Sequence, residues 1–276
     1  MKVGLHYTKL PRMVVLMSQN ISSAKDLSQG AKVNQGNNDG RTALHCAASN
    51  GHLDVTRDLI SGGAEVHKGD NDGWTPLHRA VQNGNLDVIK YLISEGAGLD
   101  KGTTVGSSAL HIAAQNGYLD VIKYLISEGA EVNKGNSRRL TALHNAASNG
   151  HLEVTKYLIS QGAEMNQEDN DGRTALCFAA FNGHLDVTKY LISQGVEINK
   201  GESEYTALQC AVLNGHIDVI KYLISKGTEV NTGNKDGMTA LHSAALEGHL
   251  DVTKYLISQL ADVNKGDNSV LTSSML

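Results

Sequence analysis

The sequence predicts an all-α fold, a solenoid of stacked helix–turn–helix units, and three observations predict it. A Thr-x-Leu-His phrase, with small variations, recurs seven times, and its first residues are 33, 33, 33, 33, 32 and 33 positions apart. A Gly-His-Leu-Asp-Val phrase or a close variant follows each copy, and a polar stretch rich in glycine separates the copies. A period near 33 residues indicates an array in which each unit touches its neighbours, with no single central core. The seven phrases begin at Thr42, Thr75, Ser108, Thr141, Thr174, Thr206 and Thr239.

The first helix of each unit is predicted from its capping residues. In the unit spanning residues 72–104, Thr75 can cap a helix through its hydroxyl, and Pro76 fits the first helical turn because its missing N–H costs little there. Apolar residues at helical spacing continue to Asn83. Gly84 then ends the helix, since glycine readily adopts the left-handed conformation found at helix C-termini.

The second helix of the same unit starts near Leu86. Its apolar residues fall at positions i, i+3, i+6 and i+7, Asp87 in the first turn suits the helix dipole, and Gly96 stops the helix. Two such short amphipathic helices cannot bury their apolar faces alone, so neighbouring units must stack. Alanine pairs in most first helices allow the close approach that stacking requires.

These phrases resemble the ankyrin repeat. The resemblance rests on Thr-[Ala/Pro]-Leu-His, the alanine pair, Gly-His-[Leu/Ile]-[Asp/Glu]-Val and the closing phrase seen at Gly129-Ala-Glu-Val-Asn133, and it covers residues 39–268. It implies antiparallel helix pairs with β-hairpin fingers at right angles to them, in a curved solenoid whose concave face binds other proteins.

The predicted organisation follows from the period. Residues 1–23 form an N-terminal flank that we expect to be poorly ordered, residues 24–38 resemble the second half of a degenerate earlier repeat, and residues 269–276 form a C-terminal tail. The apolar second helix of the last repeat must be covered either by this tail or by a longer array. The seven repeats span residues 39–71, 72–104, 105–137, 138–170, 171–203, 204–235 and 236–268.

Composition excludes several classes of function. A net charge of −5 without a basic cluster argues against nucleic-acid binding, and single lysines spaced by one repeat suggest a solvated helix edge. The apolar run at residues 13–17 is too short for a signal peptide or a membrane span. Three widely separated cysteines without a Cys-x-x-Cys pair fit a reducing compartment. We therefore expect a monomeric cytoplasmic protein without membrane insertion.

The sequence predicts no enzyme, cofactor or metal site. Ten of the twelve histidines belong to the two recurring phrases, which indicates structural hydrogen bonding. No nucleophile elbow, metal-binding His-Glu-x-x-His helix or phosphate-binding glycine loop is present. Cys46, Cys177 and Cys210 occupy repeat positions, and we expect them to be inert.

Several repeats depart from the pattern. Cys177 and Gln209 replace the motif histidine, so the Thr–His hydrogen bond that the family implies should be absent or altered in repeats five and six. Arg139 and Glu204 replace the glycine at the tip of the finger. Leu260 replaces the glycine that ends the second helix elsewhere, so we expect the last repeat to end differently or to fray.

The repeats differ most at three positions in each unit. By resemblance, two of these positions line the concave face, namely the residue before the motif threonine and the residue after the alanine pair. Large side chains at these positions concentrate in repeats five to seven, as expected of interface anchors. The alternative for Phe181 and Leu213 is that neighbouring fingers half-cover them. The predicted protein-binding residues are Trp74, Leu140, Arg173, Phe181, Tyr205, Leu213, Met238 and Leu246.

The sequence therefore predicts a non-enzymatic protein–protein interaction module, acting as a scaffold or adaptor through its concave face and fingers. One alternative is the recognition arm of a larger multidomain enzyme, channel or signalling protein, and another is a linker between membrane and cytoskeleton. A covalent alternative also stays open. Asn133 and its counterparts follow a leucine by eight residues, which resembles the asparagine that hydroxylases modify in other ankyrin repeats, although a structural asparagine explains the same pattern.

Overall fold

The structure is a computed structural model that describes residues 32–199 and 206–266. The chain divides into two compact units, an N-terminal unit of Met1–Ala113 with Lys123–Ala130 and a C-terminal unit of Ala114–Ile122 with Glu131–Leu276. Every regular element in the described ranges is an α-helix, which confirms the predicted fold class. The predicted flank at residues 1–23, most of the partial repeat and the tail at residues 269–276 lie outside the described residues, so the predicted boundaries stay predictions.

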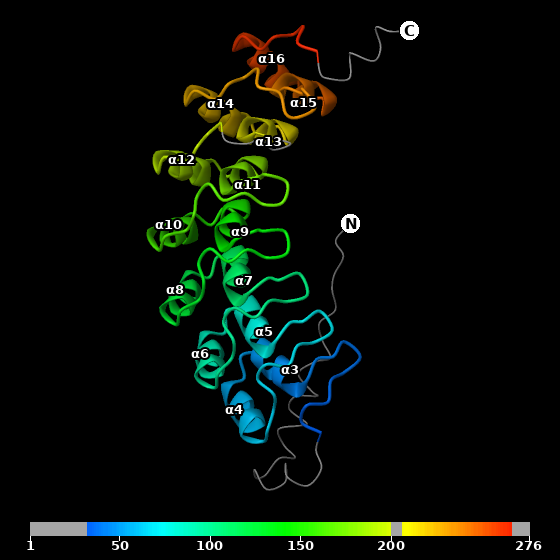
Figure 1. The fold of residues 1–276 in the computed structure, drawn as a ribbon, viewed down its shortest axis with the longest axis vertical. Coiled ribbons are helices and arrows are strands. Elements are labelled where there is room, and N and C mark those ends of the chain that lie inside the picture. The colour runs from blue at the N-terminus through cyan, green and yellow to red at the C-terminus, as the bar shows by residue number, and fades with distance from the viewer. Residues whose placement is uncertain (1–31, 200–205, 267–276) are drawn as a thin grey trace. The chain divides into compact units, whose positions relative to one another are not determined.

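Each repeat contributes two helices, and within each unit the first and second helices form separate columns (Figure 1). The first helices are α3 (Ala43–Ser49), α5 (Pro76–Gln82), α7 (Ala109–Asn116), α9 (Ala142–Ser148), α11 (Ala175–Phe181), α13 (Ala207–Leu213) and α15 (Ala240–Leu246). The second helices are α4 (Leu53–Ser61), α6 (Leu86–Ser94), α8 (Leu119–Ser127), α10 (Leu152–Ser160), α12 (Leu185–Ser193), α14 (Ile217–Ser225) and α16 (Leu250–Ser258).

A reciprocal cap fixes the start of the first helices. In α5 the hydroxyl of Thr75 accepts a hydrogen bond from the backbone N–H of His78, and Nδ1 of His78 accepts one from the backbone N–H of Thr75 at 3.0 Å. This is the capping-box arrangement, with an imidazole in the place of the usual Glu or Gln. Gly84 ends the helix at φ 70°, as the sequence predicts.

Small and branched apolar side chains fill the space between helices. Ala80 of α5 is fully buried, and Ile89 and Leu92 of α6 are equally inaccessible. Because alanine adds so little bulk, the first helices of adjacent repeats pack directly against each other within each unit. Burial of each Leu or Ile side chain contributes about 1.5–3 kcal/mol relative to exposure.

The second helices also interact through a ladder of cation–π contacts. In the N-terminal unit Nζ of Lys90 lies 5.7 Å from the ring centre of Tyr124, one repeat further along. In the C-terminal unit Lys156 and Lys189 lie over Tyr190 and Tyr222 at 6.0 and 5.7 Å. A cation over an aromatic face is stabilising by roughly 0.5–1 kcal/mol at exposed sites. The lysines that the sequence suggests as a solvated edge therefore also connect repeats.

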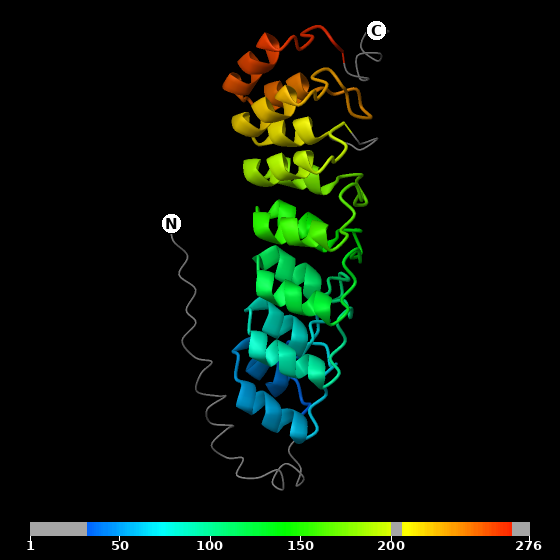
Figure 2. The same ribbon diagram turned by 90° about the vertical axis from the view of Figure 1, so that its left-hand side faces the viewer.

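The loops between repeats are tight turns, and the structure assigns no strand to them within the described residues. The backbone N–H of Asp70 donates to the carbonyl of Trp74 at 2.9 Å, and Oδ1 of Asp70 accepts from the backbone N–H groups of Asp72 and Trp74. An acidic or amide side chain thus holds the turn, and a single backbone pair is too short to form a strand. Figure 2 shows the loops of the C-terminal unit leaving the same side of its helices.

Among the described residues, two that are not glycine adopt the left-handed conformation. Arg139 takes φ 62° at the tip of its loop, and Leu260 takes φ 66° after α16. The N–H of Leu260 donates to the carbonyl of Ile257 at 3.1 Å, just as Gly227 donates to the carbonyl of Ile224 at 3.0 Å. The expectation that the last repeat ends differently or frays is therefore wrong, because the terminating hydrogen bonds hold Leu260 in a conformation that costs a branched side chain about 1–2 kcal/mol.

Replacing Leu260 by glycine is expected to stabilise the C-terminal unit. The side chain of Leu260 is 86% exposed, so Leu260→Gly loses little packing while it relieves the backbone strain. The expected gain is about 1 kcal/mol in the free energy of unfolding, measured by urea denaturation.

The matched control is Gly227→Leu, at the same position one repeat earlier. A Cβ at Gly227 meets nothing within 4 Å, so its cost reports the backbone alone. A destabilising effect of Leu260→Gly would contradict the strain.

Candidate protein-binding surface

The motif histidines His45 and His144 bridge successive repeats. Nδ1 of His45 takes part in the cap with Thr42, and its Nε2 lies 2.9 Å from the carbonyl oxygen of Trp74 in the next loop. Nε2 of His144 is 3.1 Å from the carbonyl oxygen of Gln167. Because Nδ1 accepts from the backbone, the neutral ring carries its proton on Nε2 and donates it forward. These imidazoles are committed to the fold.

The second set of histidines points backward. Nε2 of His184 is 3.0 Å from the carbonyl oxygen of Ser148, at the end of the preceding first helix. His151 makes the same contact with the carbonyl oxygen of Gln115, also at 3.0 Å. Such bonds satisfy carbonyl groups that a helix C-terminus leaves without partners.

The asparagine of the closing phrase is also engaged. In the C-terminal unit Nδ2 of Asn133 donates to the carbonyl of Gly162 at 3.0 Å, and its Oδ1 accepts from the backbone N–H of Glu164 at 2.9 Å. Both ends of the amide therefore bind the next repeat. This geometry favours a structural role for the asparagine over the covalent alternative.

The two repeats that lack a motif histidine behave differently from each other. Gln209 keeps the whole arrangement, because Oε1 accepts from the N–H of Thr206 at 2.8 Å and Nε2 donates to the carbonyl of Met238 at 2.6 Å. At Cys177 the hydroxyl of Thr174 donates a hydrogen bond to the sulfur at 3.6 Å. The expected alteration is thus small in repeat six and larger in repeat five.

Trp74 belongs to a polar cluster in the N-terminal unit. Nη2 of Arg79 donates to Oδ2 of the buried Asp70 at 2.5 Å, and the Arg79 guanidinium lies 4.5 Å from the ring centre of Trp74. Burial alone raises the pKa of Asp70, but the hydrogen bonds from Arg79 and from the backbone of Trp74 outweigh it and lower the pKa below its ordinary value. Trp74 is half-buried beneath the arginine, so it is a component of this cluster.

Arg173 is engaged in the same manner in the C-terminal unit. Its Nη2 donates to Asp169 at 2.8 Å and to Asp171 at 2.6 Å. Its guanidinium also lies 5.0 Å from the ring centre of Phe178. Arg173 therefore holds its own loop against α11, and its half-buried side chain offers only part of its surface to a partner.

The residues that end α11, α13 and α15 form what we call the apolar row, namely Phe181, Leu213 and Leu246. Phe181 is 41% exposed and Leu246 is 73% exposed, while Leu213 is half-buried. Ser148 and Gln115 stand at this position in earlier repeats. The change from polar to apolar residues is confined to the last three repeats.

The backbone beneath the apolar row is firmly held. The carbonyl of Phe181 accepts from Nδ2 of Asn214 at 2.8 Å and lies 3.0 Å from Nε2 of His216. The carbonyl of Leu213 lies 3.2 Å from Nε2 of His249. These contacts fix the register of one row residue relative to the next, so the apolar surface exists before any partner binds.

The remaining predicted binding residues lie on loops. Leu140 and Met238 precede a motif threonine, are half-buried, and donate their backbone N–H to the turn asparagines Asn136 and Asn234. Tyr205 lies outside the described residues. The contacts connect Phe181 and Leu213 to successive repeats, whereas closeness of Met238 to the row stays a prediction.

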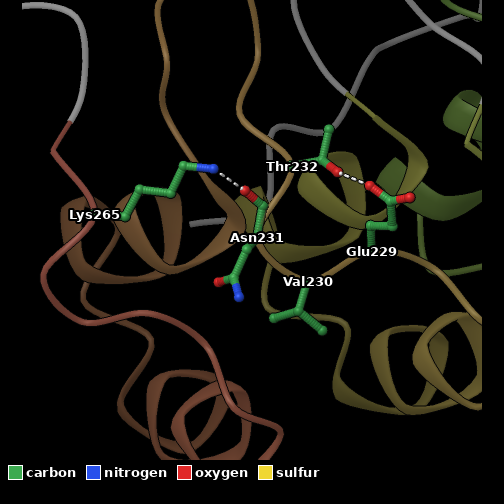
Figure 3. A pocket seen from close by; sticks show the side chains of 5 residues that line it. All are labelled: Glu229, Val230, Asn231, Thr232 and Lys265. Atoms are coloured by element: carbon green, nitrogen blue, oxygen red, sulfur yellow. Dashed lines mark hydrogen bonds between the residues drawn. The ribbon is translucent and has the colours of Figure 1, made fainter.

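An open hollow in the C-terminal unit lies between the loops of repeats six and seven (Figure 3). Nζ of Lys265 donates to the carbonyl of Asn231 at 2.5 Å, and the hydroxyl of Thr232 donates to Glu229 at 2.8 Å. The lining holds one carboxylate and one amine, and each is already hydrogen-bonded within the protein. Val230 completes the lining.

In the part of the chain that the structure describes, no three His, Cys, Asp or Glu side chains gather closely enough to hold a metal ion. None of the helices in residues 32–199 and 206–266 combines the length and the apolar character that crossing a bilayer requires.

Comparison with known proteins identifies relatives of this architecture. A family model described as ankyrin repeats (3 copies) matches residues 13–105, 65–136, 110–202 and 198–267. The crystal structure of the human ASB11 ankyrin repeat domain is similar to this chain, with a TM-score of 0.72 and 26% sequence identity. That similarity covers 79% of this chain and 98% of the other. The comparison with curated proteins finds no match.

The motif histidines are expected to make the folded protein less stable as the pH decreases. Burial lowers the pKa of His78 to about 4, and burial also lowers the pKa of His45. The native state keeps these rings neutral while the unfolded chain binds protons below about pH 6.5. The contribution of the neutral histidines to stability is therefore fully present above pH 6.5 and is lost as the pH falls toward 4. For His78 the free energy of unfolding decreases by about 1.4 kcal/mol per pH unit over this range.

Urea denaturation between pH 7.5 and 4.5, at roughly half-unit steps, measures this slope. His78→Gln is the matched variant, since Gln209 fills the same position with both bonds intact. The variant should show a shallower slope over that interval. An unchanged slope would show that His78 is not its source.

Proposed function

The chain belongs to the ankyrin-repeat family, and we propose that it is a non-enzymatic protein–protein interaction module that acts as a scaffold or adaptor. Ankyrin repeats are generally protein-binding modules, which supports the class of function. The partner docks on the apolar row and on the adjoining loops of repeats five to seven. A cytoplasmic location and a monomeric state belong to the same proposal.

The exposed apolar row is the observation that carries this proposal. Phe181 and Leu246 leave large apolar surfaces in contact with water, although the alanines beside them are tightly packed. Soluble proteins seldom expose such side chains in a connected series without a binding role. Aromatic anchors surrounded by polar groups are also typical of residues that dominate binding energy.

The hydrogen bonds beneath the row support recognition by a preformed surface. Because His216 and His249 fix the helix ends, a partner has little backbone ordering to impose on this protein. Binding then costs less conformational entropy, so a modest apolar contact suffices for useful affinity. Arg173 and Asp171 at the adjoining loop would supply the polar rim.

A second candidate function is the recognition arm of a larger multidomain protein. Leu250, Ile257 and Val263 of the last repeat are 62, 48 and 61% exposed, whereas their counterparts in earlier repeats are half-buried. A further packed element would cover these side chains. The sequence of the complete transcript distinguishes this candidate from a free-standing adaptor.

Charged substitutions in the apolar row test the proposed function. Phe181→Asp combined with Leu246→Asp should abolish capture of the partner in an affinity pull-down, because each change places a carboxylate in a surface that binding dehydrates. The melting temperature should remain almost unchanged, since both side chains are already exposed.

Gln115→Asp serves as the control, because it alters the same repeat position where the residue is already polar and exposed. It should retain binding. A loss of several kcal/mol of stability in the double variant would identify Phe181 and Leu246 as core residues and overturn the proposal.

A further inference from the structure

The loop tip of repeat four differs in charge from the other loop tips that the structure describes. Arg138 and Arg139 stand at two positions that hold an aspartate and a glycine in repeats one, two, five and seven. In repeat five, for example, these residues are Asp171 and Gly172. Repeat four therefore replaces one negative charge by two positive charges at the same place in the fold.

The turn at this tip is complete without either guanidinium group. Oδ1 of Asn136 accepts from the backbone N–H groups of Arg138 at 2.9 Å and of Leu140 at 3.1 Å. The N–H of Arg139 donates to the carbonyl of Asn136 at 2.8 Å, and the carbonyl of Arg138 accepts from the N–H of Asn170 in the next loop at 3.0 Å. The backbone thus closes the loop and fixes it to repeat five, so neither arginine side chain is needed for these contacts.

Both arginines are exposed, and their charges are not neutralised within the described part of the chain. Among the described residues, neither guanidinium takes part in an ion pair, a side-chain hydrogen bond or an aromatic contact. Arg173 in the next loop is different, because its Nη2 donates to Asp169 at 2.8 Å and to Asp171 at 2.6 Å. Asp171, the acidic residue of the adjacent tip, is therefore already paired with another arginine.

Arg139 occupies its position at a cost to the backbone. Its φ of 62° lies in the left-handed region, where Gly172 takes φ 75° at the equivalent position of repeat five. Residues held in this region against their preference are commonly found at binding sites. Because the turn bonds use only the backbone here, the guanidinium is what distinguishes Arg139 from the glycine that would fit without strain.

We propose that Arg138 and Arg139 form a recognition site for an acidic segment of a protein partner. A guanidinium presents a planar fork of N–H donors that matches a carboxylate in a bidentate pair. Two adjacent forks at an exposed tip fit neighbouring aspartate or glutamate side chains. This site rests on the proposed protein-binding function, but its residues are separate from the apolar row.

The charges elsewhere in the molecule favour a carboxylate-bearing peptide over a nucleic acid. The net charge of the chain is −5, and the tips of repeats five and seven carry the exposed aspartates Asp171 and Asp236. A phosphate backbone that followed the row of tips would be repelled by these carboxylates. A short acidic segment can instead contact the tip of repeat four alone.

Fluorescence anisotropy with the full chain and a labelled oligoglutamate peptide tests the proposal. The peptide should bind at low salt and dissociate as salt is added, because exposed charge pairs are screened. Arg138→Gln combined with Arg139→Gln should weaken binding about tenfold. An oligoglutamine peptide of the same length should not bind, since it lacks the carboxylates.

Lys156→Gln combined with Lys189→Gln is the charge-matched control, because it removes two exposed positive charges from the second helices of the same unit. This control should leave the peptide affinity nearly unchanged. Arg139→Gly should weaken peptide binding while it raises the melting temperature, since it removes the guanidinium and relieves the backbone strain. That opposite pair of effects separates recognition from folding.

The proposal is overturned if oligoglutamate does not bind, or if the lysine control weakens binding as much as the arginine variant does. Tighter binding of a single-stranded oligothymidylate than of the peptide would also overturn it, because the site would then select phosphate. The peptide assay does not involve Phe181 or Leu246. A negative result therefore leaves the pull-down test of the apolar row intact.

Discussion

One interaction recurs through both units, the two-ended side chain at the motif position. In His45 one ring nitrogen completes the cap of its own helix, and the other reaches the carbonyl of Trp74 in the next loop. The helix start and the stacking of the next repeat therefore depend on the same group. Gln209 shows that this task needs an acceptor and a donor a fixed distance apart, and it does not need an imidazole. The histidines look like a catalytic resource in the sequence, yet in His45 and His144 the fold uses both ring nitrogens.

The periodicity made the helical architecture predictable because local signals and stacking requirements agree. Thr75, Pro76 and Gly84 mark the boundaries of α5 where the structure has them. The detailed form of the loops was not predictable from the same signals, since a turn held by Asp70 and a longer strand pair share the composition of the loop. The left-handed conformation of Leu260 was not predictable from periodicity, because it depends on the balance between backbone strain and the interactions that end the helix. Strain of about 1–2 kcal/mol proved smaller than the value of the terminating hydrogen bonds and packing.

The candidate surface was predictable only in part. Phe181 and Leu246 are exposed as expected, whereas Trp74 and Arg173 are occupied by cluster contacts within the protein. No sequence rule places Arg79 over an aromatic ring, because the contact depends on side-chain direction across a loop.

The cation–π ladder has a consequence for how such a chain can change in length. Lys189 reaches the tyrosine of the following repeat, and Lys221 reaches the next in the same sense, so every rung has the same polarity. Gain or loss of one complete repeat would reconnect each of these lysines with an equivalent tyrosine. A deletion of any other size would misalign the rungs. The spacing of the lysine–tyrosine contacts therefore favours changes in length by whole repeats.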